Sequence, residues 1–564
     1  MINRALDVAL ITLLDGDLVQ QPEHLGVAYL AAELRKFGWT AEIFPISASN
    51  EAELTARIIG MNPRLVGFSL TTISFARATR LGQMIKEALG TGTHITAGGP
   101  LVTSLGASLL RNPSWSFLDS AVRGDGEEPI VNLLQALIGD GDLAGVPGLC
   151  RRTFADVICN PLGRPINDLG RYALPARDQI DFGPGMTARI ASSRGCTSRC
   201  SFCNAPNAAN TLSGKVWRGR TPQSVVDEME AIYRGMKAQD FEFVDSTFED
   251  PGGTPWAKQR IASIAELILE RGLNITFGCC VQAQNWREAD AWLIDLLKRA
   301  GLQRVLIGVE SGSDEALKRW SKKATAADNL RAIGLFRSRS IYVNMGFIMF
   351  HPYSTRQEVM ENAAFLRAAG CHTLRPFCTR LEVYPGTAVL EELREERLLR
   401  PEYERTLDPY AYRFVDADLQ RLAYAMALLA GEEYADTGAV TTLPPHLQFG
   451  FLDVALHTKI TRKMRSDAMA GLPTYRFRDF FFEYRAICEG IGAFNYELFQ
   501  TIAALVLSGK SPQEAVGGLL DDVQFWYEKK MDEVSSLYGS CMEEEFPFAA
   551  LNASLLSNSM AGVP

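Results

Sequence analysis

The sequence predicts an α/β protein with three domains: a doubly wound domain in residues 1–145, a partial (β/α)6 barrel in 183–395 and a mostly helical domain in 396–564. Short apolar runs alternate with helical patterns in two separate regions, which is typical of parallel sheets covered by helices. The last third of the chain keeps only the helical periodicity. Between the two alternating regions, 146–182 is rich in Pro, Gly and Arg, and we expect it to be a linker that lets one domain lie over the other.

The first domain alternates five expected strands with five expected helices. The strands are Ala5 to Leu13, Thr40 to Ile46, Leu65 to Ser69, His94 to Ala97 and Phe117 to Val122. The helices are His24 to Phe37, Ala52 to Met61, Phe75 to Leu89, Ser104 to Arg111 and Glu128 to Ile138. Doubly wound sheets bind ligands at the carboxyl edge of their strands. The loops at that edge are Gln21 to Gly26, Ser69 to Thr72, Ala97 to Pro100 and Arg123 to Glu127.

The second region repeats the same rhythm. Its expected strands are Met186 to Ser193, Phe241 to Asp245, Ile275 to Cys279, Arg304 to Val309, Tyr342 to Phe350 and Thr373 to Leu381. Its expected helices are Pro222 to Met236, Pro255 to Glu270, Glu288 to Ala300, Ala324 to Ser338 and Thr355 to Ala369. This alternation predicts a parallel sheet with its helices outside, and chemistry in the loops after the strands.

Three cysteines, Cys196, Cys200 and Cys203, follow the first of these strands. The spacing C-x3-C-x2-C can hold three irons of a four-iron cluster, whereas cluster sites are normally closed by four thiolates. No fourth cysteine lies near this loop in the sequence, so one iron keeps an open position, as in metal sites that carry out chemistry. The alternative is a structural zinc loop completed from elsewhere, although zinc sites usually use two spaced pairs.

This motif, with the aromatic Phe202 directly before the last cysteine, resembles the signature of radical S-adenosylmethionine (SAM) enzymes, over about Leu169 to Leu390. The resemblance implies that the three thiolates hold a [4Fe-4S] cluster and that SAM chelates the open iron. It implies that an electron from the cluster cleaves SAM to a 5'-deoxyadenosyl radical. An external electron donor of flavodoxin or ferredoxin type is also expected.

Residues at the carboxyl ends of the barrel strands are expected to face the cluster. The stretch Gly308 to Gly312 resembles the fourth-strand signature of radical SAM proteins preceded by a cobalamin-type domain, and a strand end with a helix cap is the alternative. Many relatives have an arginine near the end of the third strand, where this chain reads Cys279 to Asn285. The candidates for SAM contacts are Phe202, Asp245, Ser246, Gln282, Glu310, Ser311 and Phe350.

The edge loops of the first domain resemble the cobalamin-binding domain that precedes the radical SAM barrel in a large class of enzymes, down to the helix start at Leu25-Gly26. A vestigial or purely structural domain is the alternative. The residues that the resemblance assigns to cobalamin are Leu25, Gly26, Ser69, Leu70, Thr71, Thr72, Gly98, Gly99, Gly124, Gly126 and Glu127. Because the loop lacks a D-x-H-x-x-G motif, we expect His24 to be an ordinary helix-start residue and Leu70 to lie nearest the lower face of cobalt.

Composition narrows the function classes. The chain has 57 basic and 66 acidic residues, a net charge of -9, and no basic run, which argues against nucleic acid as the main partner. Its 11 cysteines lack paired spacing, which suits a reducing compartment. Asp7 interrupts the first apolar stretch, and no run approaches the ~20 apolar residues of a spanning helix. We therefore expect a cytoplasmic protein that does not act at a membrane.

The combined resemblance implies a cobalamin-dependent radical SAM methyltransferase that moves a methyl group from SAM through methylcobalamin to carbon. The substrate class expected is a natural-product or peptide intermediate. Methylation of an electron-rich carbon by a polar route fits the same motifs. The alternatives are an enzyme with both cofactors that rearranges, cyclises or oxidises its substrate, and a non-catalytic cobalamin or iron–sulfur sensor.

Overall fold

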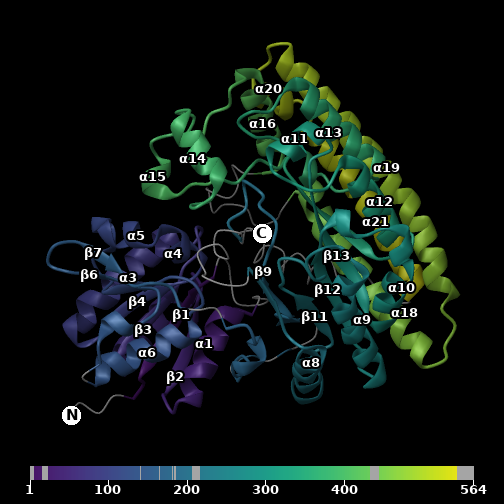
Figure 1. The fold of residues 1–564 in the computed structure, drawn as a ribbon. Helices are drawn as coiled ribbons and strands as arrows, with labels where there is room; N and C mark the ends of the chain where they lie inside the picture. The colour runs from purple at the N-terminus through teal and green to yellow at the C-terminus, as the bar shows by residue number, and fades with distance from the viewer. Residues whose placement is uncertain are drawn as a thin grey trace.

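The computed structural model describes residues 5–14, 23–139, 141–163, 166–178, 180, 182, 186–205, 216–431 and 444–542. Two α/β domains lie side by side, and long helices of the C-terminal third cover the outer side of the second one (Figure 1). The expected loop positions Gln21 and Pro22, and residues 543–564 of the C-terminal domain, lie outside the described residues.

The N-terminal sheet has the strand order β2-β1-β3-β4-β5-β6-β7, and its first five strands are parallel. The strands are β1 (Val8–Leu13), β2 (Ala41–Ile46), β3 (Leu65–Ser69), β4 (His94–Gly98), β5 (Ser120–Val122), β6 (Leu149–Arg152) and β7 (Val157–Cys159). The helices are α1 (Leu25–Lys36), α2 (Glu51–Met61), α3 (Phe75–Leu89), α4 (Pro100–Leu105), α5 (Ala107–Arg111) and α6 (Glu127–Ile138).

Strand β1 is buried on both faces, as expected for the centre of a doubly wound sheet. Val8 and Leu10 pack with residues of α1 and α6, whereas Ala9 and Ile11 pack with residues of α2 to α5. The second of these cores continues into the segment 381–412, which follows the barrel. The two α/β domains therefore share packed apolar surface.

The sheet of the first domain extends beyond the boundary expected at residue 145. Strands β6 and β7 run antiparallel to β5 and to each other, in the segment that we assigned to the linker. Cys150 and Cys159 occupy paired positions on them and form a disulfide, which the cysteine spacing did not predict. The remaining linker holds the buried Arg177, which contacts Glu23 of the first domain at 2.6 Å and Glu228 of the second at 2.8 Å.

The second sheet is parallel, in the order β14-β13-β12-β11-β8. The strands of this region, including the separate β9–β10 pair, are β8 (Thr187–Ile190), β9 (Ser193–Gly195), β10 (Trp217–Gly219), β11 (Asp240–Phe243), β12 (Thr276–Val281), β13 (Leu302–Glu310) and β14 (Tyr342–Phe347). The helices are α8 (Pro222–Met236), α9 (Pro255–Glu270), α10 (Ala291–Ala300), α11 (Asp314–Arg319), α12 (Ala326–Arg337) and α13 (Arg356–Ala368).

The sixth strand of the expected barrel, Thr373 to Leu381, is largely replaced by irregular structure. Arg375–Phe377 forms a 3-10 turn, and the pairing is reduced to one parallel bridge between Phe350 and Arg380. Pro376 explains the loss, because it has no N–H to donate to a ladder and fixes a φ that suits a turn.

The described C-terminal region is helical. Its helices are α14 (Ala388–Glu395), α15 (Tyr403–Thr406), α16 (Ala417–Leu429), α18 (Pro445–Met469), α19 (Tyr475–Leu507), α20 (Pro512–Gly517) and α21 (Leu520–Met542). Within the described residues, α19 alone is long and apolar enough to cross a membrane, with 44% of its most apolar window buried in the protein. Its buried side chains, such as Phe480, Ile491 and Phe499, belong to the same core as the barrel helices, so it packs as a core helix does.

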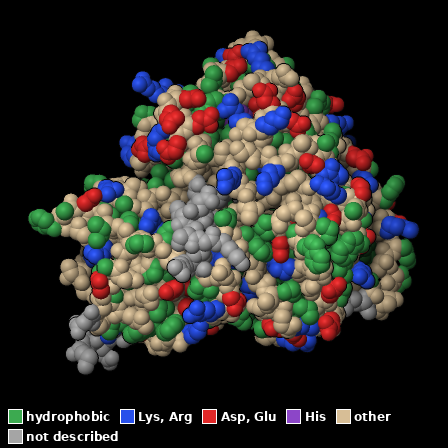
Figure 2. All heavy atoms as spheres, viewed as in Figure 1, with side chains coloured by type: hydrophobic (Ala, Val, Ile, Leu, Met, Phe, Trp, Pro, Cys, Tyr) green, Lys and Arg blue, Asp and Glu red, His purple; other side chains and the backbone are tan. Residues whose placement is uncertain are grey.

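Acidic and basic side chains are interspersed over the face of the molecule seen in Figure 2, and apolar side chains lie singly or in small groups between them. The electrostatic potential of this face is therefore mixed in sign, and the net negative charge of the chain is not gathered there.

Candidate active site

The cysteine loop leaves the barrel through a short hairpin. Strand β9 pairs antiparallel with β10, and Gly195 at its end has a φ of 94°. A Cβ atom on Gly195 would lie 1.9 Å from the carbonyl oxygen of Val216, so only glycine allows this turn. Cys196 follows directly, at the carboxyl end of the sheet.

The three cysteines share one short loop, which its own backbone hydrogen bonds hold in shape. The Cys203 N–H donates to the carbonyl of Cys200, and the Ser198 N–H donates to the Sγ of Cys196. Burial raises the pKa of Cys200 to about 11 and also raises that of Cys203, so without a metal both are neutral thiols. Three neighbouring sulfur donors fit an iron–sulfur cluster, and its binding would release their protons.

Neighbouring elements hold this loop in place. The Ser201 N–H donates to the carbonyl of Trp320 at 3.1 Å, and the Ser201 carbonyl accepts from the N–H of Val389 at 3.1 Å. Phe202 packs edge-on against Trp320, with 5.9 Å between ring centroids. The aromatic residue of the motif thus anchors the loop to the end of α11, and a contact of Phe202 with SAM remains a prediction.

Gln282 and Glu310, two of the expected SAM contacts, lie at this loop or beside it. The Gln282 amide donates to the Sγ of Cys196 at 3.7 Å and to the Oγ of Ser198 at 3.2 Å. The buried Glu249, which the sequence did not single out, fixes Gln282 by accepting from its backbone N–H at 2.9 Å. Gln282 therefore lies against the cysteine loop, and its contact with SAM remains a prediction.

Glu310 ends β13 with a φ of 64°, where the pairing with β14 shifts register. Its carboxylate pairs with Lys322 at 3.0 Å. Although burial favours the neutral amine, Glu310 and the Cys200 thiol raise the pKa of Lys322 above its ordinary value. Lys322 therefore places a positive charge beside the cluster loop, and sequence reasoning missed it.

Three other candidates for SAM contacts face the core. Asp245 is buried and accepts hydrogen bonds from Ser192 and Ser193, at the start of the segment that leads to the cysteines. The Ser311 hydroxyl donates to Asn362 in the core at 2.7 Å, and the Phe350 side chain is fully buried. The three side chains support strand ends, and contacts of these residues with SAM remain predictions. Ser246 is exposed, and its contact with SAM remains a prediction.

The edge of the first domain shows which of the expected cobalamin residues a ligand can reach. Gly26 faces open space, since nothing lies within 4 Å of an added Cβ, and Thr71 is exposed. Leu70 is fully buried and packs in the domain core, and its place nearest cobalt remains a prediction. Cobalamin contacts of Gly26 and Thr71 stay predictions, as do those of Leu25, Ser69, Thr72, Gly98 and Gly99.

Replacing Gly99 with alanine is expected to destabilise the first domain by at least ~1–2 kcal/mol, the cost of a left-handed conformation for an L-residue. Gly99 has a φ of 99°, and its added Cβ would lie 2.9 Å from the Leu70 carbonyl oxygen. The displaced loop should also bind hydroxocobalamin more weakly, as measured by absorbance titration beside thermal unfolding. The matched Gly26→Ala change, in open space near the start of α1, should leave the fold intact. Wild-type stability and affinity in Gly99→Ala would contradict the expectation.

The loop before α6 turns toward the barrel. Gly124 has a φ of 83°, and a Cβ on Gly126 would lie 3.1 Å from Leu30 of α1. Glu127 is buried and pairs with Arg194 of β9 at 2.5 Å. The Glu127 carboxylate therefore binds the second domain, and contacts of Gly124, Gly126 and Glu127 with cobalamin remain predictions.

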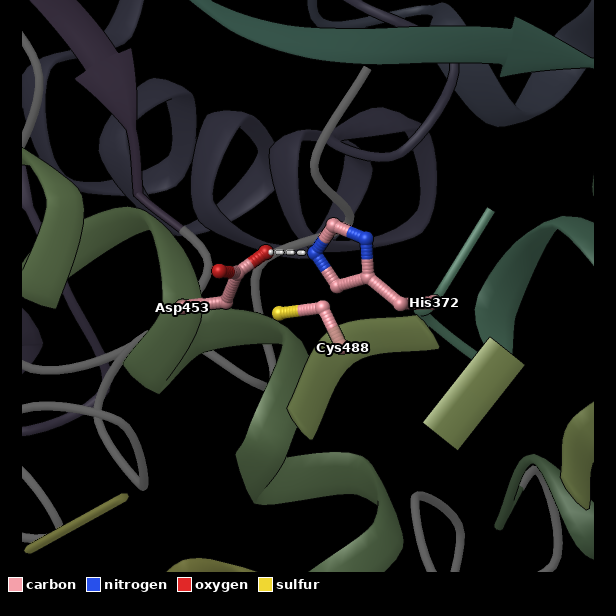
Figure 3. A group of neighbouring side chains, drawn as sticks. All are labelled: His372, Asp453 and Cys488. Carbon is pink, nitrogen blue, oxygen red and sulfur yellow. Dashed lines mark hydrogen bonds and ion pairs between the residues drawn. The ribbon is translucent and has the colours of Figure 1, made fainter. Parts of the chain in front are cut away.

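A second polar group lies where the helical region meets the barrel. His372 donates to Asp453 of α18 at 2.7 Å, and Cys488 of α19 lies beside them (Figure 3). Tyr342 of β14 and Tyr484 of α19 donate to the Asp453 carboxylate at 2.7 and 2.5 Å. The hydrogen bonds from His372, Tyr342 and Tyr484 to Asp453 indicate a structural ion pair.

Two family models match the chain. The B12 binding domain covers residues 12–134, and the radical SAM superfamily covers residues 190–366. Fold and site thus define an enzyme that pairs a cobalamin-binding domain with a radical SAM barrel. The chain thus carries both a B12 binding domain and a radical SAM domain, and the cofactors of these domains are a [4Fe-4S] cluster, SAM and cobalamin.

Known proteins of more than one activity are similar to this chain. An uncharacterized methyltransferase of Pyrococcus horikoshii is 26% identical over 66% of this chain and 79% of its own length. The anaerobic magnesium-protoporphyrin IX monomethyl ester cyclase of Rubrivivax gelatinosus is 28% identical over 60% of this chain and 61% of its own. The structure of OxsB, a cobalamin-dependent SAM radical enzyme with aqua-cobalamin and SAM bound, shares the fold, with a TM-score of 0.65 at 19% identity over 99% of this chain and 84% of that one.

Proposed function

We propose that this protein is a cobalamin-dependent radical SAM methyltransferase that transfers a methyl group from SAM, by way of methylcobalamin, to a carbon of a natural-product or peptide intermediate. The observation that carries the proposal is the contact between the two cofactor regions. The loop before α6 in the cobalamin-binding domain pairs with Arg194, two residues before the cluster ligand Cys196. A substrate held at this junction would meet both reagents, and such proximity makes a two-reagent reaction efficient.

When bound, cobalamin carries the methyl group and the cluster supplies the electron that cleaves SAM. The side chains around the cysteine loop hold one another in fixed positions. Glu249 orients Gln282 toward Cys196, and Lys322 balances the charge of Glu310 beside the cluster loop. Phe202 of the loop packs against the fully buried Trp320 and so holds the loop on the barrel. Similarity to the Pyrococcus horikoshii methyltransferase over most of its length supports the methyl-transfer assignment.

The test needs no known substrate. Cluster-reconstituted, cobalamin-loaded protein is incubated anaerobically with SAM bearing a deuterated methyl group and with titanium(III) citrate. Mass spectrometry then counts S-adenosylhomocysteine, 5'-deoxyadenosine and deuterated methylcobalamin. Labelled methylcobalamin together with both nucleoside products supports radical methylation, whereas S-adenosylhomocysteine without 5'-deoxyadenosine favours the polar route.

A second candidate is an enzyme with the same cofactors that closes a ring, rearranges or oxidises its substrate. The similarity to the Rubrivivax gelatinosus cyclase favours it, at slightly higher identity than the methyltransferase. In the same assay this enzyme would form 5'-deoxyadenosine without labelled methylcobalamin. A protein that binds SAM and forms none of the three products either lacks its substrate or is a sensor.

A further inference from the structure

Two arginines occupy paired positions on the β9–β10 hairpin that leads into the cysteine loop. Arg194 of β9 lies directly opposite Arg218 of β10 in the antiparallel register. Like charges at directly opposed positions destabilise a pair of strands. Neither arginine is exposed, since their side chains are 21% and 3% accessible, so water screens their repulsion only weakly.

Acidic residues of the other domain compensate these charges. Glu127 pairs with Arg194 at 2.5 Å, and Asp125 contacts Arg194 at 3.4 Å and Arg218 at 2.8 Å. Asp125 lies in the glycine-containing loop at the carboxyl edge of the cobalamin-binding sheet, and Glu127 is the first residue of α6, which follows that loop. Charge-assisted hydrogen bonds between arginine and carboxylate are stronger than those between neutral groups. Arg194 and Arg218 both have such an acidic partner on this loop.

Aromatic rings complete the environment of Arg194. Its guanidinium lies over the ring of Tyr29 at 5.0 Å and over that of Tyr172 at 5.4 Å. Tyr29 belongs to α1, which starts at the candidate cobalamin residues Leu25 and Gly26, and Tyr172 belongs to the linker. Arg194 therefore contacts the edge loop, the first helix and the linker at once, while its own strand ends one residue before Cys196.

We propose that Arg194 is a positioning residue through which the cobalamin-binding loop and the cluster loop set each other's geometry. Glu127 and Asp125 hold the arginine hairpin in register when the loop is ordered, so binding of cobalamin at the edge and of the cluster at the cysteines stabilise one shared arrangement. By linkage, each cofactor then raises the affinity for the other by the same factor. This inference rests on the two cofactors of the family and is independent of methyl transfer.

The test measures that factor. Hydroxocobalamin affinity is determined by equilibrium dialysis for the protein with and without its reconstituted cluster. We expect the cluster to tighten wild-type binding by roughly 5-fold or more, within the usual range of coupling between sites. Glu127→Gln should bring the ratio close to one at unchanged iron and sulfide content. The EPR signal of the reduced cluster should respond to cobalamin in the wild type and not in this variant.

Two further variants keep the result decisive. The Asp125 side chain is 24% accessible, so the protein should fold with Asp125→Asn. This variant should lower the affinity ratio even if Glu127→Gln does not fold. Asp178→Asn is the control, because it removes an exposed 2.6 Å pair between the linker and Arg35 of α1 and does not touch the hairpin. A wild-type ratio near one, or equal ratios in wild type, Glu127→Gln and Asp125→Asn, would overturn the proposal. Loss of coupling in the Asp178→Asn control to the same extent as in Glu127→Gln and Asp125→Asn would also overturn the proposal.

Discussion

Replacing Cys200 with alanine is expected to abolish cluster assembly and, with it, cleavage of SAM. Cys200 supplies one of the three thiols, and the described part of the loop offers no other cysteine to replace it. Changes to groups that merely support a metal ligand already cost ~10–100-fold, so loss of a ligand should cost more than that. Iron and sulfide content, cluster absorption and the amount of 5'-deoxyadenosine formed under reducing, anaerobic conditions measure the effect.

The matched control is Cys541→Ala. Cys541 is also a buried free cysteine, but it lies on α21, where its thiol is directed toward the Arg476 carbonyl. This variant should keep its cluster and its SAM cleavage, with at most a modest loss of stability. A Cys200→Ala protein with a full complement of iron and undiminished 5'-deoxyadenosine would refute the assignment of the three cysteines as the cluster ligands.

Much of the architecture could be predicted because it follows from patterns along the chain. The first apolar run forms β1, which is buried on both faces. The alternation of apolar runs and helical patterns along the chain predicts the helices that cover the two faces of this sheet. The exception is the segment around Pro376, where proline turns an apolar run into a 3-10 turn. The short strands β6 and β7 were missed because a run as brief as Val157–Cys159 carries almost no periodicity.

The side chains of the site were harder to predict, because neighbouring residues at a strand end point to opposite sides. Asp245 faces the core and Ser246 faces outward, and a sequence pattern alone did not tell them apart. Lys322 and Arg194 were missed because their partners lie 12 and 67 residues away, so that only folding brings the charges together.

The largest stability effect is expected at Asp453. Asp453→Asn should destabilise the protein by ~3–5 kcal/mol, the cost of leaving a buried charge without its partner. The carboxylate is 1% accessible and accepts from His372, Tyr342 and Tyr484, so the change affects β14, the loop after α13, α18 and α19 together. Anaerobic urea unfolding of the cluster-reconstituted protein, followed by circular dichroism, measures it. Asp418→Asn, at an exposed ion pair, should cost under ~1 kcal/mol.

The pH dependence of the stability lost in Asp453→Asn shows whether His372 is charged in the folded protein, whatever the size of the loss. Burial alone would lower the pKa of His372, but Cys488 and Asp453 raise it well above its ordinary value. A raised folded pKa gives stability that is fully present below about pH 6.5 and is lost as the pH rises through the folded pKa. The cost of Asp453→Asn should therefore be larger at about pH 6 than at about pH 9. An equal cost at about pH 6 and about pH 9 would mean that His372 is neutral in the folded protein. The barrel and the helical region would then be joined here by hydrogen bonds to Asp453 without an ion pair.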